Sequence, residues 1–393
     1  ATFSWLFAAL LSADGPVIRR GFPLGLDFLE ILEILELLEI LETLDHPEEA
    51  QPPIPIIYMR HSLLLPLLLL PALFVGGLLC GSQWIAPADV WEAMMGTAGS
   101  DPLAHSIVCE LRLPALLTAL LAGSALGVAG LLMQTVFDNP LADPSILGVN
   151  AGAGLGAAVC LLLMGGALGG GVVGTGGLLT VSLGAFIGAA GVMAVLGICA
   201  SVLRHHLMLL VAGVMISYAV GAVVTLLSFF ASADGLRSYV VWGMGSYGSV
   251  GTDALPVFAA LVAVGLLVSL CLGKPLNALL LGDAYAQNLG YRLRSLRMAI
   301  LALGGGLCAV CTALCGPIAF IGLAVPHVAR LTLRTADHRL LLPATLLWGA
   351  DISLACHLIS LIGGAGMVLP LNAITALVGV PVALLIMRKG QRG

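Results

Sequence analysis

The sequence is poor in charge. Only 9% of its 393 residues are Asp, Glu, Lys or Arg, 60% are hydrophobic, and the mean hydropathy is +1.09. Soluble domains carry about 25% charged residues, so this composition excludes an ordinary soluble protein. Many uncharged stretches reach the roughly 20 residues that cross a bilayer as a helix, and unbroken apolar runs exclude an alternating barrel pattern. The sequence therefore predicts an all-α, polytopic membrane protein.

Catalytic motifs are also missing. The chain has no GxxxxGK[ST] loop for ATP, no HExxH, and no GxSxG flanked by partners. Cys308, Cys311 and Cys315 share a helix face, but no His or carboxylate lies nearby in sequence, which disfavours a metal site. We expect no enzyme activity, no cofactor in this chain and no nucleic-acid partner. Energy for any transport must come from an ion gradient or another subunit.

Residues 1–58 differ from the rest of the chain. They contain ten acidic residues against Arg19 and Arg20, and a Glu recurs every third residue from Glu30 to Glu42. That period drifts around a helix and gives no clean amphipathic face. A proline-rich linker follows, and the natural-looking start Met59-Arg60-His61 comes next. We expect residues 1–58 to be an extension that is dispensable for function, and residues 59–393 to form the membrane domain.

Ten apolar segments follow. They run approximately over 62–80, 113–133, 144–165, 175–200, 208–231, 253–273, 298–315, 317–333, 341–362 and 370–388. If ten spans alternate, twelve basic residues fall on one side: Arg60, Arg204, Lys274, Arg292, Arg294, Arg297, Arg330, Arg334, Arg339, Arg388, Lys389 and Arg392. The other side receives only Arg112 and Arg237. The positive-inside rule then makes the first side, with both termini, cytoplasmic.

The interior of the chain has one strongly charged island, Lys274–Arg297. Its pattern predicts a short helix around Asp283, a break at Gly290 and a second short basic helix, with Leu289 and Leu293 packed underneath. A pair of short helices between two spans is suited to docking a soluble partner. The alternative is an ordinary cytoplasmic loop.

Four blocks, in order, resemble one family. They are Arg112-Leu113-Pro114 with the run Gly123–Gly154, then Leu281–Gly290, Gly316–Leu331 and Asp337–Pro343. This arrangement is similar to the FecCD-type permeases of ATP-binding-cassette importers, which take up iron chelates and vitamin B12. The blocks cover nearly all of residues 62–393 and leave residues 1–58 outside the resemblance.

The resemblance implies a ten-span permease that works as a homodimer in the bacterial inner membrane. Its expected partners are a second copy, two ATPase subunits that bind ATP-Mg, a periplasmic or lipid-anchored substrate-binding protein, and lipid. In the family, short helices at the third block insert into a cleft on the ATPase. This sequence keeps five residues of that block: Gly282, Asp283, Ala286, Leu289 and Gly290.

Other residues give weaker signals. Asn139-Pro140 and Asp143-Pro144 predict a cytoplasmic turn in which Asp143 or Asn139 caps the next helix. Pro326, His327 and Arg330 invite a substrate-ligand role, but basic anchoring or ATPase contact is favoured over it. We group these residues with Asp337, His338 and Arg339 as a cytoplasmic motif.

The gate and the outer face depart from the family pattern. His206 and Leu207 stand where the vitamin B12 permease narrows its cytoplasmic gate with small hydroxylated residues, and a haem-ligand role for His205 or His206 is an alternative. Of three arginines expected to receive the binding protein, only Arg112 is kept, with Ala115 at the second position. We therefore expect docking through Arg112 and Arg237.

Together these signals predict a permease subunit that imports a ferric siderophore, haem or cobalamin. The resemblance implies a path between the second, fifth and tenth spans of two copies. The alternative from another class is an ion-coupled secondary transporter, which calls for paired carboxylates or unwound helices near the midplane. Only Asp351 lies well inside a predicted span, and it is alone. An intramembrane enzyme is the third possibility, and no nucleophile–base pair supports it.

Overall fold

The computed structural model describes residues 56–81, 84–96, 102–164, 175–202, 206–363 and 368–390. Side chains are described there except at residues 56–62, 164, 175–176, 178, 201–202, 206–207 and 383–390. By its internal contacts the chain divides into residues 1–55 and residues 56–393. The predicted extension at 1–58 thus falls almost wholly outside the described residues, and its role stays a prediction.

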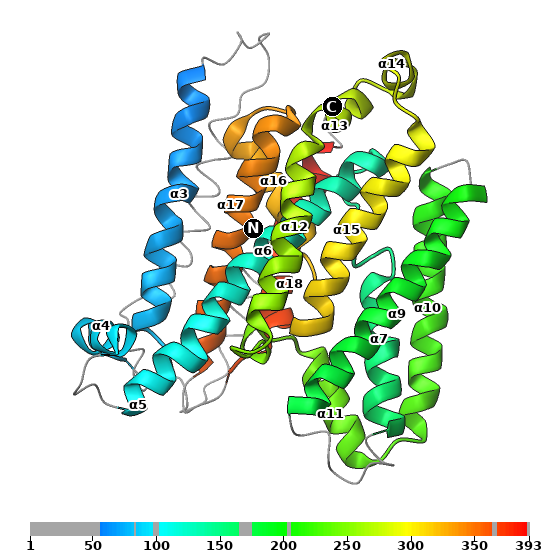
Figure 1. Cartoon of the computed structure of the whole chain (residues 1–393). Coiled ribbons are helices and arrows are strands. Elements are labelled where there is room, and N and C mark those ends of the chain that lie inside the picture. Colours follow the sequence, from blue (N-terminus) through cyan, green and yellow to red (C-terminus); the bar gives the residue numbers. More distant parts are fainter. Residues whose placement is uncertain are drawn as a thin grey trace. The chain divides into compact units, whose positions relative to one another are not determined.

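The described part of the chain is built from helices and contains no strand, which confirms the all-α prediction (Figure 1). In chain order the elements are α3 (Ile56–Leu79), α4 (Pro87–Met95), α5 (Pro102–His105), η1 (Ser106–Arg112), α6 (Leu113–Phe137), α7 (Val149–Ala158), η2 (Val159–Met164), α9 (Thr175–Val202), α10 (His206–Phe229), α11 (Ala233–Gly243), η4 (Tyr247–Ser249), α12 (Leu255–Cys271), α13 (Gly273–Leu280), α14 (Asp283–Asn288), α15 (Leu293–Cys315), α16 (Ile321–Leu333), α17 (His338–Ser360), η5 (Leu361–Gly363) and α18 (Leu371–Gly390).

Each of the ten apolar segments contains a described helix, but not every one of these helices is long enough to cross a membrane. Among the described residues, five helices are long and apolar enough to cross a membrane, or six if α12 and α13 form one bent span. Four shorter apolar helices stand at other predicted segments, within α3, α7–η2, α16 and α18. Hydropathy therefore located the helices, and the number of complete crossings stays a prediction.

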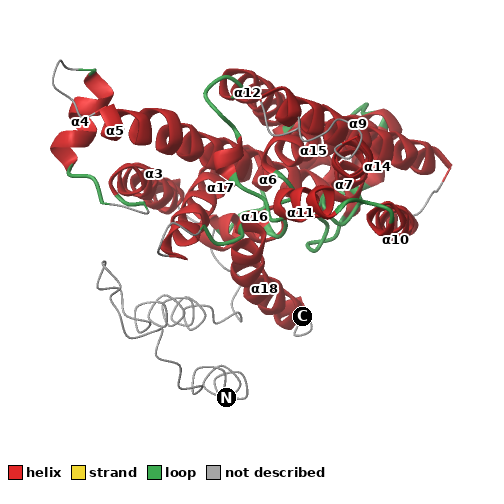
Figure 2. Ribbon diagram, turned by 90° about the horizontal axis from the view of Figure 1, so that it is seen from below, coloured by secondary structure: helices red, strands yellow, loops and turns green. Residues whose placement is uncertain are grey.

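The centre of this unit is α6. It is apolar all round, and most of its side chains are buried, as expected for a helix enclosed by others. It packs against α17, α15, α16 and α12, which surround it in the view along the helices (Figure 2). Because the protomer's own helices cover α6, the second span offers little surface to a transport path. Whether this span lines the path stays a prediction.

Glycine allows two helix pairs to pack backbone to backbone. A Cβ at Gly123 of α6 would overlap the carbonyl oxygen of Gly349 on α17, and a Cβ at Gly349 would overlap that of Gly123. Gly152 of α7 and Gly188 of α9 exclude each other's side chains in the same way. Small residues at such crossings let transmembrane helices approach closely where lipid provides no hydrophobic drive.

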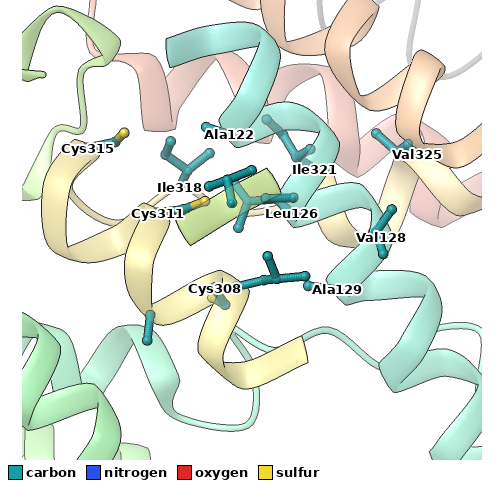
Figure 3. Close-up of a cluster of buried hydrophobic side chains, with 14 of the residues drawn as sticks. Ala122, Leu126, Val128, Ala129, Cys308, Cys311, Cys315, Ile318, Ile321 and Val325 are labelled. Atoms are coloured by element: carbon teal, nitrogen blue, oxygen red, sulfur yellow. The ribbon is translucent and has the colours of Figure 1, made fainter. Parts of the chain in front are cut away.

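The three cysteines of α15 belong to the apolar core. Cys308, Cys311 and Cys315 are each 1% exposed, and they pack between α6 and the segment that leads into α16 (Figure 3). Leu126 and Ile318 are among their neighbours in this cluster. No group of three or more metal-ligating residues occurs in the described ranges. These thiols therefore serve as small hydrophobic side chains.

The helices place different elements at the two ends of the unit. α13 and α14 lie at one end, together with the start of α3, while α4, α5 and α11 lie at the opposite end (Figure 1). The link between α16 and α17 belongs to the α13 end, because Gly273 contacts Arg339. The Lys274–Arg297 island therefore shares one end with the Asp337–Arg339 motif, and Arg237 of α11 is at the other.

Candidate coupling surface

The charged island folds as two short helices and the start of a long one. α13 bends away from α12 by 52°. Gly282 and Gly290, with φ of +99° and +87°, bracket α14 in a conformation that other residues adopt only under strain. The helix pair is thus α13 and α14, both before Gly290. The basic residues after Gly290 belong to the first turns of α15, which corrects the prediction of a second short helix there.

α14 is exposed on nearly all sides. Ala286 is fully buried and anchors the helix, whereas Leu281, Tyr285 and Leu289 are 66%, 47% and 56% exposed. Leu289 therefore does not pack underneath, because the small Ala286 faces inward in its place. Exposed apolar side chains next to polar ones are typical of a protein interaction site.

An ion pair holds α14 against α15. The Arg297 guanidinium donates to Asp283 Oδ1 at 2.7 Å. Asp283 is the first residue of α14, where a carboxylate is also favoured by the helix dipole. Exposed pairs of this kind contribute only about 0–1 kcal/mol. The pair therefore sets the orientation of α14 more than it stabilises the fold.

α13 is tied to α17 by one amide side chain. Asn277 Oδ1 accepts a hydrogen bond from the His338 backbone N at 2.8 Å and lies 3.0 Å from His338 Nδ1. Asn277 Nδ2 donates to Asp337 Oδ1. Asp337 Oδ1 also accepts from the Arg339 amide at 2.9 Å, which makes Asp337 the N-cap of α17.

The charge state of Asp337 follows from these contacts. Burial favours a higher pKa for this carboxyl group, but hydrogen bonds from Asn277 and from the Arg339 amide, with the positive charge of Arg339, outweigh it. The pKa of Asp337 therefore lies below its usual 3.8. The carboxylate stays ionised at neutral pH and remains a strong acceptor for the cap.

α16 and α17 are bonded to the end of α6. Arg330 Nη1 donates to Gln134 Oε1 at 2.6 Å, and Thr135 Oγ1 lies 2.8 Å from His338 Nε2. Pro326 is buried within α16, and the side chain of His327 is half-buried. Arg330 thus contacts a buried glutamine of the same chain, so anchoring is the role that its contacts support.

The turn after α6 differs from the predicted cap. Asn139 Oδ1 accepts from the Leu141 amide, and Asp143 Oδ1 accepts from the Ser145 amide at 2.7 Å. Burial raises the pKa of Asp143, and its hydrogen bonds from Ser145 oppose that shift. α7 begins only at Val149, and its N-cap residue, Gly148, makes no side-chain cap. Neither Asn139 nor Asp143 caps the next helix, because each closes its own turn. Pro140 is exposed and Pro144 is buried in these turns.

At the opposite end, Arg112 and Arg237 have different surroundings. Arg112 is 8% exposed, and its Nη1 donates to the carbonyl oxygens of Leu78 and Leu79, at 2.7 and 3.1 Å, where α3 ends. Its guanidinium thus bonds to carbonyl groups at the end of a helix, which have no partner within that helix. These bonds leave Arg112 little surface for a binding protein, whereas Arg237 on α11 is exposed. Docking through these two arginines stays a prediction.

Two further predictions concern groups inside the apolar part. The side chains of His206 and Leu207 lie outside the described residues, as does all of His205, so the gate prediction stays open. Asp351 is 1% exposed on α17, and neither of its carboxylate oxygens has a hydrogen-bond partner among the described residues. The other buried carboxylate among the described residues, Asp143, bonds to Ser145 in the turn after α6, so the described contacts show no pairing of the two.

The sequence did not point to Asn277, Gln134 or Thr135. Their only signal is that each is a polar residue within an apolar helix. Their hydrogen-bond partners lie far away in sequence, so the role of each residue can be seen only in the folded chain.

Residues 67–389 match the FecCD transport family. The chain belongs to this family. It is 36% identical over 337 residues to the vitamin B12 import system permease protein BtuC of Escherichia coli O17:K52:H18, a match that covers 85% of this chain and 96% of that protein. The BtuC protein of Citrobacter koseri is also 36% identical, over 318 residues, covering 80% of this chain and 90% of the relative.

The fold matches a solved permease. A structure described as an inward-facing conformation of a putative metal-chelate type ABC transporter aligns with a TM-score of 0.73 and 28% identity. The alignment covers 84% of this chain and 99% of that one. Members of the FecCD family are membrane permease subunits and not enzymes, and a separate subunit hydrolyses ATP. The family thus implies an ATPase and a substrate-binding partner for this chain.

Proposed function

We propose that this chain is the permease subunit of an importer for a metal chelate or cobalamin, and that α14 is its contact with the ATPase. The observation that carries the proposal is the exposure of Leu281, Tyr285 and Leu289 around a helix whose only buried residue is Ala286. An apolar patch that is exposed among polar residues is typical of a site that binds another protein. The ATP-Mg is bound by that partner.

The proposed orientation places the α13–α14 end in the cytoplasm. Seven basic residues with described side chains belong to this end: Lys274, Arg292, Arg294, Arg297, Arg330, Arg334 and Arg339. Their position agrees with the positive-inside rule and with an ATPase on the cytoplasmic side. The opposite end, with α4 and α11, then faces the substrate-binding protein, and Arg237 is its exposed cation.

The transport path is proposed to run between two copies, along α10 and α18. α10 carries many exposed apolar side chains, among them Tyr218 at 72% and Leu226 at 63%. Beside it lies a cavity of about 350 Å³ lined by residues of α7, α10 and α11, with Asn150 and Tyr239 among its polar groups. Such a wall holds a bulky amphipathic ligand weakly, as a path requires, and leaves selection to the binding protein.

The function is tested by uptake into proteoliposomes. The chain is reconstituted with its ATPase and binding protein, and ATP-driven uptake of labelled cobalamin, haem and a ferric siderophore is compared. Uptake of one ligand that needs internal ATP and persists in the presence of protonophores and sodium ionophores would support the proposal. Uptake that needs an ion gradient and no ATP would overturn it in favour of ion-coupled transport.

A further inference from the structure

α13 is the only part of the island with inward polar bonds among the described contacts. Leu276 and Ala278 provide its apolar contacts, and apolar surfaces can slide past each other with little change in energy. The bonds of Asn277 are directional, and they reach the N-cap residue of α17, Asp337, and its first residue, His338. Because of this difference, a displacement of α13 can move the start of α17 only while the hydrogen bonds of Asn277 remain formed.

His338 continues this connection into the core. Its side chain is 1% exposed, and it lies between Asn277 of α13 and Thr135 of α6. A neutral imidazole with its proton on Nδ1 donates to Asn277 Oδ1. Its Nε2 is then an acceptor for the Thr135 hydroxyl, which also has the Leu131 carbonyl oxygen as an acceptor at 2.9 Å. One ring therefore contacts both the short helix and the central helix.

The residue before Thr135 extends the connection to α16. Gln134 is 3% exposed and accepts from Arg330. Its Nε2 lies 3.4 Å from the carbonyl oxygens of Gly322 and Leu323, in the first turn of α16. Two adjacent residues of α6 thus bond to α17 and α16. Buried hydrogen-bond networks of this kind specify one arrangement, since a partly broken network leaves costly unpaired groups.

We propose that Asn277 and His338 form a joint that transmits displacement of α13 and α14 to α17 and α6, and so couples ATP hydrolysis to opening of the path. Both are positioning residues, since neither lies in the transport path. The inference rests on the proposed function, because it assumes that an ATPase moves α14. It goes beyond that function by naming the residues on which coupling depends.

The joint is tested in the reconstituted complex of permease, ATPase and binding protein. Asn277→Leu keeps the volume and removes the bonds, and His338→Phe removes both ring nitrogens. We expect each variant to co-purify with the ATPase and to hydrolyse ATP, while the number of substrate molecules moved per ATP falls about tenfold. That factor lies within the roughly 5- to 150-fold range of typical coupling free energies.

A control and a rescue separate coupling from general damage. Thr332→Val removes the hydrogen bond from Trp348 Nε1, at 3.1 Å, which joins α16 to α17 without contacting α13. This variant should keep the wild-type ratio of transport to hydrolysis. Asn277→Asp places a second carboxylate against Asp337 and should uncouple transport. The double variant Asn277→Asp/Asp337→Asn reverses the direction of that bond and should restore the ratio.

Three outcomes would overturn the inference while the complex itself remains active: an unchanged ratio in Asn277→Leu, an equal loss in Thr332→Val, or no restoration in the double variant. If the wild-type chain recovers no ATPase, the proposed function fails first, and the two failures are thus distinguishable. Melting temperatures of all variants are measured beside the ratio. A variant that loses ATPase binding and stability together counts against a role specific to coupling.

Discussion

Gly123 should not tolerate even a methyl group. A Cβ built there overlaps the carbonyl oxygen of Gly349 and the Cβ of Ser353, both on α17. Backbone atoms cannot rotate away as the end of a flexible side chain can, so α6 and α17 must move apart. Overpacking of this kind typically costs about 1–3 kcal/mol. The substitution therefore weakens the packing of α6, the most buried helix of the described unit, against α17.

The matched control is Gly191 of α9. A Cβ at Gly191 meets nothing within 4 Å. Alanine is favoured over glycine in a helix by about 0.5–1 kcal/mol, so Gly191→Ala should be neutral or slightly stabilising. Gly123→Ala gains the same helix propensity, so the free energies of unfolding of the two variants should differ by the overpacking cost alone, about 1–3 kcal/mol, with Gly123→Ala the less stable.

The assay is unfolding of the purified chain in mixed micelles of increasing SDS fraction, followed by circular dichroism. The free energy of unfolding is compared for the wild type, Gly123→Ala and Gly191→Ala. If Gly123→Ala is as stable as Gly191→Ala, the close packing of α6 and α17 is not as described here, and the placement of the central helix would have to be revised.

Three further changes are predicted. Arg112→Ala should destabilise the fold by about 1.5–3 kcal/mol, because charged hydrogen bonds to the end of α3 are lost. Arg237→Ala should change the free energy of unfolding by no more than about 0.5 kcal/mol in the same SDS titration. Equal effects of the two substitutions would contradict the buried role of Arg112. Asp337→Ala should cost about 0.5–2 kcal/mol at pH 7. Since the pKa of Asp337 is lowered in the folded state, its contribution is complete above 3.8 and is lost as pH falls through the folded pKa. The deficit should therefore be flat from pH 5 to 8 and should shrink only below 3.8, and a deficit that changes near neutrality would refute the assignment. Arg297→Ala should lower ATPase affinity only a few-fold, because the exposed pair with Asp283 is worth about 0–1 kcal/mol, and binding curves with purified ATPase measure this.

The sequence was sufficient to place the helices. Hydropathy depends on local composition, so segments such as 298–315 and 341–362 contain helices where they were expected. It was not sufficient to count crossings, since α16 and α18 are short in their apolar part. The exposed island at Lys274–Arg297 was also predictable, because charge in an apolar chain marks an end of a span.

Side-chain surroundings could not be predicted in the same way. Arg112 was expected to meet the binding protein because of its place in the family's arginine pattern, but it donates to carbonyl oxygens at the end of α3. Leu289 was expected to pack inward from its spacing to Leu293, yet α14 buries Ala286 and leaves Leu289 exposed. Asn277 and His338 are 61 positions apart. Their meeting depends on how α13 crosses α17, and no local pattern encodes that crossing.

The central claim, that α14 docks an ATPase, is tested most directly by co-purification from detergent. Asp283→Arg reverses a charge on the first residue of α14, and Asp234→Arg makes the same change in the first turn of α11, at the opposite end of the unit (Figure 1). The account predicts that the wild type and Asp234→Arg recover the ATPase and that Asp283→Arg, although stable and folded, does not. Recovery of the ATPase by Asp283→Arg at the wild-type level would contradict it.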